Sequence, residues 1–181
     1  MKEFPDKVST YSVKHIHEVL DEIQKLPANY KAWNLGLASA LACGAFTFLL
    51  GGGPVEMCCA FLGAGVGNFV RKKMLGHSIS LLANVAVSVA ASCLVYVLTI
   101  LLAQQLLSVS AVHQAGYICA MLFVIPGFPL ITGGIDLAKL DLRSGLERVS
   151  YALLIILTAT MTGWATAAIC QFQPADFEPL Q

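Results

Sequence analysis

Five stretches of mostly apolar residues, each about as long as a membrane-spanning helix, constrain this chain more than any other feature. A helix needs about 20 mostly apolar residues to cross the roughly 30 Å hydrocarbon core of a bilayer. Only 12% of the 181 residues are charged, whereas a soluble domain carries about 25%. The sequence therefore predicts an all-α, polytopic membrane protein with five transmembrane helices, at Trp33–Leu50, Pro54–Val70, Ile79–Ala103, His113–Ile135 and Leu146–Cys170.

The first 31 residues form the one long polar segment of the chain. Apolar residues recur there at helical spacing from Val13 to Leu26, and Pro27 ends the pattern. This spacing predicts a short amphipathic helix on the membrane surface or against the ends of the bundle. The start of the chain lacks a basic stretch followed by an apolar run, so no cleavable signal peptide is expected. The predicted organisation is a cytoplasmic segment 1–31, a five-helix domain 32–171 and an extracytoplasmic tail 172–181.

The basic residues indicate how the helices are oriented. Five lysines precede the first predicted span, three basic residues follow the second, and three lie between the fourth and fifth, which accounts for all 11. Because basic residues in short loops stay on the cytoplasmic side, the N-terminus is predicted inside and the C-terminus outside the cytoplasmic (inner) membrane. The 11 acidic residues balance this charge, so no nucleic-acid partner is expected.

Small residues and cysteines lie within the apolar stretches. Small residues recur every four positions in the first two predicted helices, at Gly36, Ala40 and Gly44 and at Gly63 and Gly67. This pattern is typical of closely packed membrane helices. The six cysteines have no metal-ligand spacing and are expected to pack as small residues rather than to form disulfides or hold a metal. No cofactor is expected either.

The strongest local signal is the motif Ile125–Asp136 in the fourth stretch, which reads IPGFPLITGGID. Pro126 and Pro129, with Gly127 between them, cannot donate backbone hydrogen bonds, so the helix is predicted to break at this Pro-Gly-x-Pro motif. Non-helical backbone at membrane depth is tolerated only inside protein or beside a water-filled cavity. A half-helix beginning near Pro129 would direct unpaired N–H groups at a substrate carboxylate, with Thr132 as a second donor. The alternative is a packed proline kink without a ligand.

Three charged residues are candidates for function. Asp136 lies one to two turns beyond the break, where it would carry a proton or bind a substrate ammonium, unless it is a solvated carboxylate at the interface. Glu56 is either a second proton-coupling group or an acid that stabilises the start of the second helix. Arg148 is a membrane anchor, a partner of a nearby carboxylate such as Asp136, or a contact for an anionic substrate. Ser144 and Glu147 fit a capping box that would begin the last helix.

No catalytic constellation can be assembled from these residues. The sequence lacks a plausible Ser/His/Asp triad, a pair of catalytic carboxylates, an HExxH motif and a phosphate-binding loop. The chain is therefore not expected to be an enzyme.

Several of these motifs together resemble the threonine/serine exporter family of bacterial and fungal membrane proteins. The resemblance rests on Phe46–Gly53, Ala60–Gly63, Pro126-Gly127, Asp136 and Ser144-Gly145 with Arg148. It extends from about residue 30 to residue 168. Family members usually carry a longer helical region before the first span, and many have Thr-Asn where this chain has Thr132-Gly133.

The resemblance implies export of amino acids driven by an ion gradient or, in split relatives made of two polypeptides, export of dicarboxylates such as succinate. The motif-bearing part of the family looks like one half of a ten-helix transporter, so this chain would need a second half or a homo-oligomer as partner. The favoured function is a half-subunit for proton-coupled export of threonine or serine. The alternatives are a dicarboxylate exporter subunit, for which Arg148 is the available second positive group, and a non-transporting scaffold or regulatory subunit. Substrate would be bound by Pro126, Gly127, Thr132 and Asp136, with Asp136 and Glu56 coupling protons.

Overall fold

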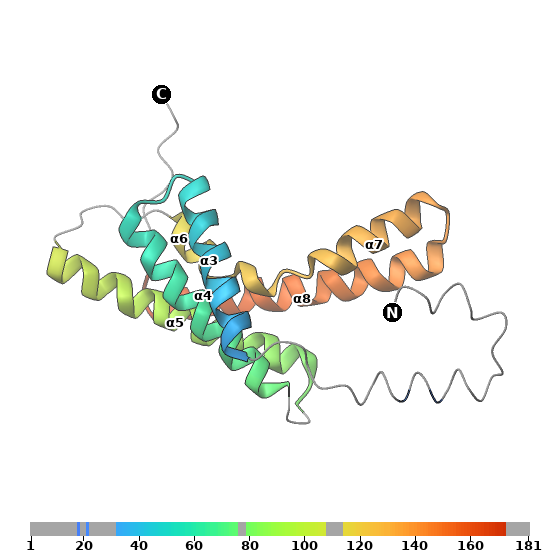
Figure 1. Cartoon of the computed structure of the whole chain (residues 1–181), viewed down its shortest axis with the longest axis horizontal. Coiled ribbons are helices and arrows are strands. Elements are labelled where there is room, and N and C mark those ends of the chain that lie inside the picture. Colours follow the sequence, from blue (N-terminus) through green and yellow to red (C-terminus); the bar gives the residue numbers. More distant parts are fainter. Residues whose placement is uncertain (1–17, 19–20, 22–31, 76–78, 108–113, 173–181) are drawn as a thin grey trace. The chain divides into compact units, whose positions relative to one another are not determined.

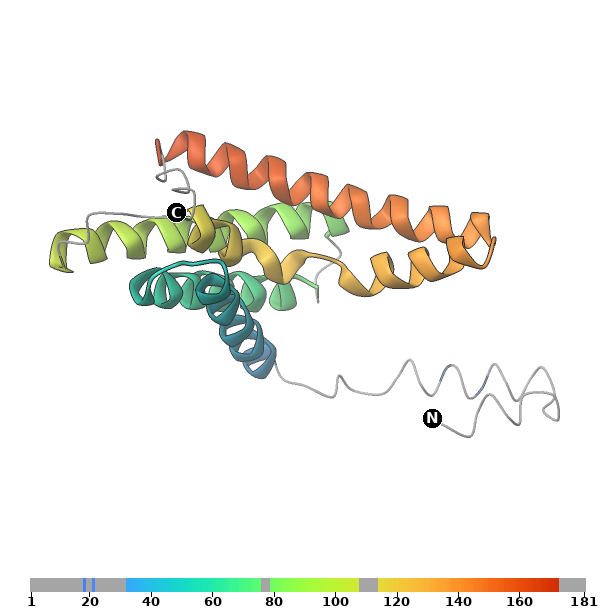
Figure 2. The same ribbon diagram turned by 90° about the horizontal axis from the view of Figure 1, so that it is seen from above.

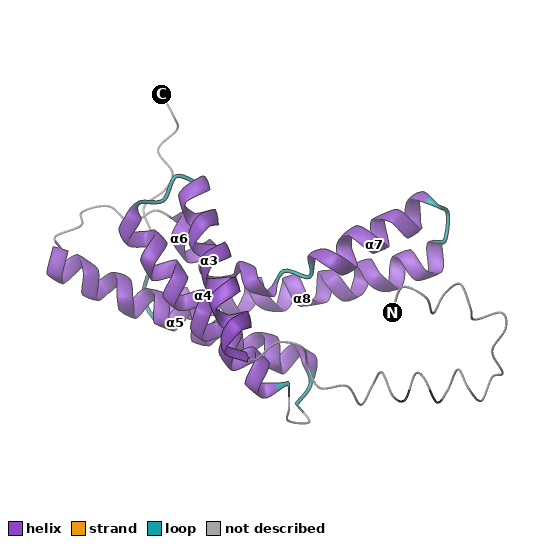
Figure 3. Cartoon of the chain, in the orientation of Figure 1, coloured by secondary structure: helices purple, strands orange, loops and turns teal. Residues whose placement is uncertain are grey.

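The computed structural model describes residues 18, 21, 32–75, 79–107 and 114–172. Contacts divide the chain into two units, Met1–Lys31 and Ala32–Gln181, and the following account concerns the second. The described residues contain helices and loops without a strand (Figure 3), in agreement with the predicted all-α class. Apart from residues 18 and 21, the predicted amphipathic helix lies outside the described residues, as does most of the C-terminal tail.

Six α-helices and one 3-10 helix are described in the second unit (Figure 1). They are α3 (Ala32–Leu49), α4 (Pro54–Met74), α5 (Leu81–Leu107), α6 (Gln114–Met121), the 3-10 helix η2 (Leu122–Val124), α7 (Gly127–Ala138) and α8 (Leu142–Ile169). Helix α4 packs mainly on α3, α5 and α6, while α8 packs on α5 and α7. Figure 2 shows α7 continuing beyond α6, beside the N-terminal half of α8.

Fewer than five of the described helices are long and apolar enough to cross a membrane on their own. Within the described residues, α5 and α8 are long and apolar enough to cross a membrane, and the bent pair of α6–η2 and α7 is a third candidate. Helix α3 is apolar but short, and α4 carries Glu56 at one end and three consecutive basic residues at the other. The five-span count therefore stays a prediction.

The glycines allow three helices to approach one another closely. A Cβ on Gly36 would lie 3.3 Å from the carbonyl oxygen of Gly65, and one on Gly65 would lie 3.2 Å from Ala40 Cβ, so these residues join α3 to α4. Gly63 and Gly67 lie on another face of α4, where added Cβ atoms would come within 2.9 Å of Ser92 O and 2.7 Å of Ser92 Cβ. The predicted small residues do mediate close packing. On α4 they contact two different helices, because Gly65 faces α3 whereas Gly63 and Gly67 face α5.

The apolar core lies where α4, α5, α6 and α8 meet. It includes Val85 and Val89 of α5, Ala60 of α4 and Ile155 of α8, all fully or almost fully buried. The six cysteines are free thiols, and four of them are buried in the bundle, as expected for small packing residues.

Candidate functional site

The fourth apolar stretch bends between η2 and α7. The bend lies at Ile125 and Pro126, and the two helices meet at 71°. Ile125 is extended, with φ −58° and ψ 121°, as expected for a residue that precedes proline. This geometry is shared by a broken span and a re-entrant loop, so the prediction of one broken membrane-crossing helix is not decided by it.

Helix α7 begins at Gly127, earlier than the predicted start near Pro129. Pro129 is tolerated inside the first turn because N–H groups there have no helical acceptor. The Gly127 N–H donates to Ile125 O at 2.9 Å, and the Leu130 N–H donates to Pro126 O. Among the described hydrogen bonds, only the N–H of Phe128 remains available at this helix start. An array of N–H groups able to hold a carboxylate is therefore not present.

The broken backbone is tied to α4 by an arginine. Nη1 of Arg71 donates to Phe123 O at 3.2 Å, and this carbonyl lies in η2, just before the bend. The Phe123 ring occupies the space left by Gly67, where a Cβ would lie 2.7 Å from the ring. Arg71 thus satisfies a carbonyl that the interruption of the helix leaves without its usual partner.

Helices α7 and α8 form a hairpin, defined here as Gly127–Ile155, that is closed by two glycines. An added Cβ on Gly133 would lie 2.9 Å from Val149 Cγ2, and one on Gly145 would lie 2.7 Å from Leu137 Cγ. The turn between the helices contains Leu140 with φ 64°, a left-handed conformation that is costly for leucine. The close approach of the backbones places side chains of α7 directly against α8.

The start of α8 differs from the predicted capping box of Ser144 and Glu147. The helix begins at Leu142, and its N-cap is Asp141, whose carboxylate accepts the Ser144 N–H at 3.4 Å. Asp141 takes this role because the left-handed Leu140 turns the chain directly before it. Ser144 therefore lies inside the first turn, and Glu147 instead pairs with Arg143 at 3.5 Å on the exposed face.

Asp136 of α7 and Arg148 of α8 form an ion pair across this hairpin. Nη1 of Arg148 lies 2.8 Å from Oδ2 of Asp136, but the atoms are not aligned for a hydrogen bond. The side chains of Asp136 and Arg148 are 22% and 50% exposed, so Arg148 is reachable from outside the hairpin, whereas Oδ2 of Asp136 is buried against it. Of the options open for Arg148 in the sequence, the structure shows pairing with Asp136. Its role toward a substrate is untested.

The other predicted site residues lie at different distances from this pair. Thr132 lies one turn before Asp136 on α7, and its hydroxyl donates to Phe128 O at 2.8 Å. Its proton is therefore engaged, while its oxygen can still accept. Pro126 and Gly127 lie at the opposite end of α7, nine residues or about 13 Å along the helix from Asp136. The structure thus brings Asp136 and Arg148 together, with Thr132 one helical turn away and the proline motif at the other end of α7.

Glu56 lies at the start of α4, away from the hairpin. It is 2% exposed, and its Oε2 accepts the Gly53 N–H at 2.9 Å, the carboxylate half of a capping box. Figure 1 shows this end of α4 and the α7–α8 turn at opposite sides of the bundle. Stabilisation of the helix start is thus observed, and proton coupling by Glu56 stays a prediction.

A seam of buried polar side chains along α5 was missed in the sequence. Asn84, Ser88, Ser92 and Tyr96 recur every four residues and are all buried. The seam connects three helices, because Asn84 Nδ2 donates to Arg71 O at 3.3 Å and Ser92 Oγ donates to Ala120 O at 2.6 Å. Asn84 Oδ1 and Tyr96 Oη have no hydrogen-bond partner among the described residues. Polar residues at four-residue spacing within an apolar helix were the available signal.

Two neighbouring tyrosines give a matched test of this packing. Tyr117 Oη donates to Gly163 O at 2.7 Å, whereas Oη of Tyr96, which is also buried, donates to no described group. We expect Tyr117→Phe to lower the free energy of unfolding by about 1 kcal/mol and Tyr96→Phe to leave it unchanged or raise it. Fluorescence-detected thermal unfolding of both variants in detergent measures the difference. A larger loss in Tyr96→Phe would contradict the assigned hydrogen bonding.

Comparison with known proteins places these observations in context. Residues 2–170 match a family model described as "Putative threonine/serine exporter". A protein named "Probable succinate transporter subunit YjjP" from Klebsiella aerogenes is 27% identical over 163 residues, which cover 83% of this chain and 61% of that protein. Its namesake from Escherichia coli K12 is 26% identical over 150 residues, covering 83% of this chain and 56% of that protein. The chain thus spans about three fifths of these relatives. No solved structure matches it.

Proposed function

Because the chain belongs to the threonine/serine exporter family, we propose that it is a half-subunit of a secondary transporter that exports threonine or serine with proton coupling. The observation that carries this proposal is the ion pair of Asp136 and Arg148. The pair joins two helices, its arginine is half-exposed, and its atoms are not aligned as a hydrogen bond. It is therefore an internal contact that a better-fitting ligand can replace.

The charges of the pair are complementary to an amino acid. The substrate carboxylate would take the place of Asp136 on the Arg148 guanidinium, which binds carboxylates in a bidentate manner. The substrate ammonium would then neutralise Asp136, and the oxygen of Thr132 one turn away would accept a further hydrogen bond from it. Asp136 would also carry the coupling proton, at a step of the cycle in which its contact with Arg148 is open. Glu56 is a second candidate for that proton, and Pro126 and Gly127 would shape the bend rather than bind substrate.

A dicarboxylate is the second candidate, favoured by the names of the two relatives. One carboxylate of succinate would bind Arg148, but the other would lie near Asp136 and be repelled unless that group were protonated. A zwitterion meets no such repulsion, and the pair therefore favours threonine or serine. The alternative to a transporter is a non-transporting subunit that scaffolds or regulates a partner protein.

The proposed arrangement in the membrane is five spans with the N-terminus inside. It is supported by the basic residues, since they lie in the last turn of α4 and around the α7–α8 turn, whereas the described residues between α3 and α4 carry none. The relatives are named subunits, and a second half or another copy would complete the substrate path around these few helices.

Efflux from preloaded cells tests the proposal directly. Cells that express the chain with a candidate second half are loaded with labelled threonine, serine or succinate, and loss of label is compared with empty-vector cells. We expect faster loss of threonine or serine, reduced when the proton gradient is collapsed. Loss of succinate alone would establish the second candidate. If none of the three leaves faster although the complex is present, the scaffold reading replaces export.

A further inference from the structure

We propose that the groove between α3 and α4 binds one acyl chain of an anionic phospholipid whose phosphate lies beside Lys73. The inference uses the proposed membrane location and is independent of the exported substrate.

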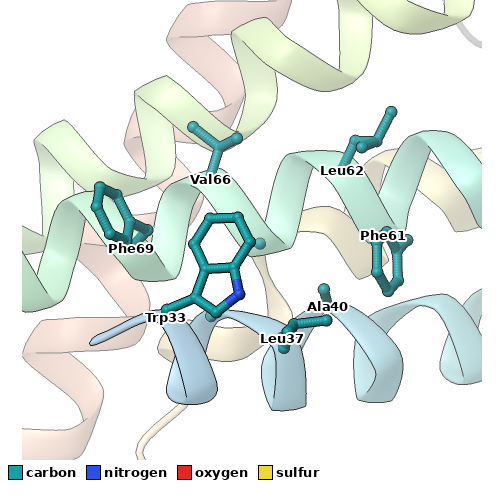
Figure 4. Close-up of a pocket in the computed structure, with 9 residues that line it drawn as sticks. Trp33, Leu37, Ala40, Phe61, Leu62, Val66 and Phe69 are labelled. Atoms are coloured by element: carbon teal, nitrogen blue, oxygen red, sulfur yellow. The ribbon is translucent and has the colours of Figure 1, made fainter. Parts of the chain in front are cut away.

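The groove is an apolar hollow of about 210 Å³ along the α3–α4 contact (Figure 4). At one end the rings of Trp33 and Phe69 meet edge to face, with centroids 6.4 Å apart and planes at 79°. Phe61 and Ala40 lie toward the other end in Figure 4, and the sides are formed by Leu37, Leu62 and Val66. Nothing in this lining would hydrogen-bond a polar ligand strongly, so the fitting occupant is a hydrocarbon.

The floor of the groove cannot close by moving the helices together. It is formed by Gly36 and Gly65, where the backbones already touch, since a Cβ on Gly36 would lie 3.3 Å from Gly65 O. The larger side chains on either side stand above this contact. The hollow is therefore a consequence of the glycines and persists as long as α3 and α4 are packed together.

The length of the groove matches one leaflet. Its α4 side runs from Phe61 to Phe69, eight residues or about 12 Å along the helix. Half of the hydrocarbon core measures about 15 Å. Phe69 lies two residues before the basic run that begins at Arg71, and tryptophan at the same end is typical of a membrane interface. The groove thus begins at the basic end of α4 and extends toward the bilayer centre.

A positive charge lies where the lipid headgroup would be. A second hollow of about 410 Å³ shares Phe69 with the groove and is lined also by Lys73 and Met74. Lys73 is exposed and has no acidic partner among the described residues, whereas Arg71 is engaged with Phe123 O. Basic residues at this position attract the anionic lipids of the cytoplasmic leaflet. An apolar groove and an adjoining hollow with Lys73 in its wall together favour an anionic phospholipid over a neutral one.

The fluorescence of Trp33 can report lipid binding in the groove, because the chain contains only one other tryptophan, Trp164. The full chain carrying Trp164→Phe is reconstituted in vesicles of phosphatidylethanolamine with increasing fractions of either brominated phosphatidylglycerol or brominated phosphatidylethanolamine. We expect half-maximal quenching at a threefold or more lower fraction of the anionic lipid. Val66→Phe, which fills the groove, should reduce quenching by both lipids.

Charge variants separate the site from general attraction to the surface. Lys73→Gln should abolish the preference for the anionic lipid, while Lys139→Gln, at an exposed lysine of the α7–α8 turn, should retain it. Glycerol phosphate at millimolar concentration should not compete, since the groove binds the chain and not the headgroup alone. Equal quenching by the two lipids, an unchanged preference in Lys73→Gln, or competition by glycerol phosphate would each overturn the proposal.

Discussion

Asp136→Asn is expected to reduce efflux of the exported substrate at least tenfold while the protein remains in the membrane at wild-type levels. The substitution keeps the size of the side chain but removes the charge that faces Arg148 at 2.8 Å. An uncompensated, half-exposed arginine costs little stability because water and lipid headgroups can reach it. A substrate ammonium and a coupling proton would lose their ligand altogether. The loss should therefore appear in transport and not in folding.

A matched control and a charge exchange make this test decisive. Glu147→Gln removes an exposed carboxylate that pairs with Arg143 one turn away on the same helix, and it should leave efflux unchanged. The exchange Asp136→Arg with Arg148→Asp keeps an ion pair across the hairpin but reverses its direction. Wild-type thermal stability of the exchanged pair without wild-type efflux would support a role in binding. Full efflux from Asp136→Asn or from the exchanged pair would show that the ion pair is only structural.

Gly133→Leu is expected to separate α7 from α8 and to reduce efflux more than tenfold, whereas Gly134→Leu at the next position should behave like wild type. A Cβ on Gly133 would lie 2.9 Å from Val149 Cγ2 and 3.1 Å from Arg148 Cβ, so a larger side chain must push the helices apart. A Cβ on Gly134 meets no atom within 4 Å. Both variants add the same apolar side chain to the same helix turn.

The readouts for this pair are efflux and the separation of the two helices. Cysteines at Asp136 and Arg148 would remove the ion pair. Spin labels are therefore attached to cysteines substituted for Lys139 and Arg143, after Cys58 and the half-exposed Cys170 are replaced and the labelled protein with Gly133 intact is shown to transport. They measure the spacing across the turn. We expect a wider spacing in Gly133→Leu alone. Similar losses in both glycine variants would indicate that the exposed face of α7, and not its contact with α8, is critical.

Much of this architecture follows from the pattern of apolar residues, but the details of the turns do not. Helices α5 and α8 were predicted because long apolar runs have few alternatives in lipid. Helix α8 nevertheless begins four residues before the predicted Leu146, since Leu140 adopts a left-handed conformation that its residue type does not favour. The chain bends at Ile125 and Pro126, within the proline motif, but α7 starts at Gly127 because the first turn of a helix accepts Pro129, and the broken span stays a prediction.

The candidate site was predictable only in part. Asp136 and Arg148 stand twelve positions apart, and their pairing depends on the close contact of Gly133 and Gly145 with the opposite helix, which spacing alone does not reveal. Sequence reasoning expected several free N–H groups at the start of α7. Pro126 and Pro129 have no N–H group, and the N–H of Gly127 donates to Ile125 O. The α5 seam was overlooked because serine in a membrane helix is ambiguous until its acceptor is seen.

The hairpin is joined to the rest of the bundle by two connections of unequal stiffness. At Ile125–Pro126 the helical hydrogen-bond ladder is interrupted, whereas α8 continues without a break for 28 residues, about 42 Å. A tilt of the hairpin would therefore bend the chain at Ile125–Pro126. The same tilt would move the continuous helix α8 as one rigid element. Its far arm carries Gly163, which accepts the Tyr117 hydroxyl. A displacement at the Asp136–Arg148 pair would thus be transmitted along α8 toward Gly163.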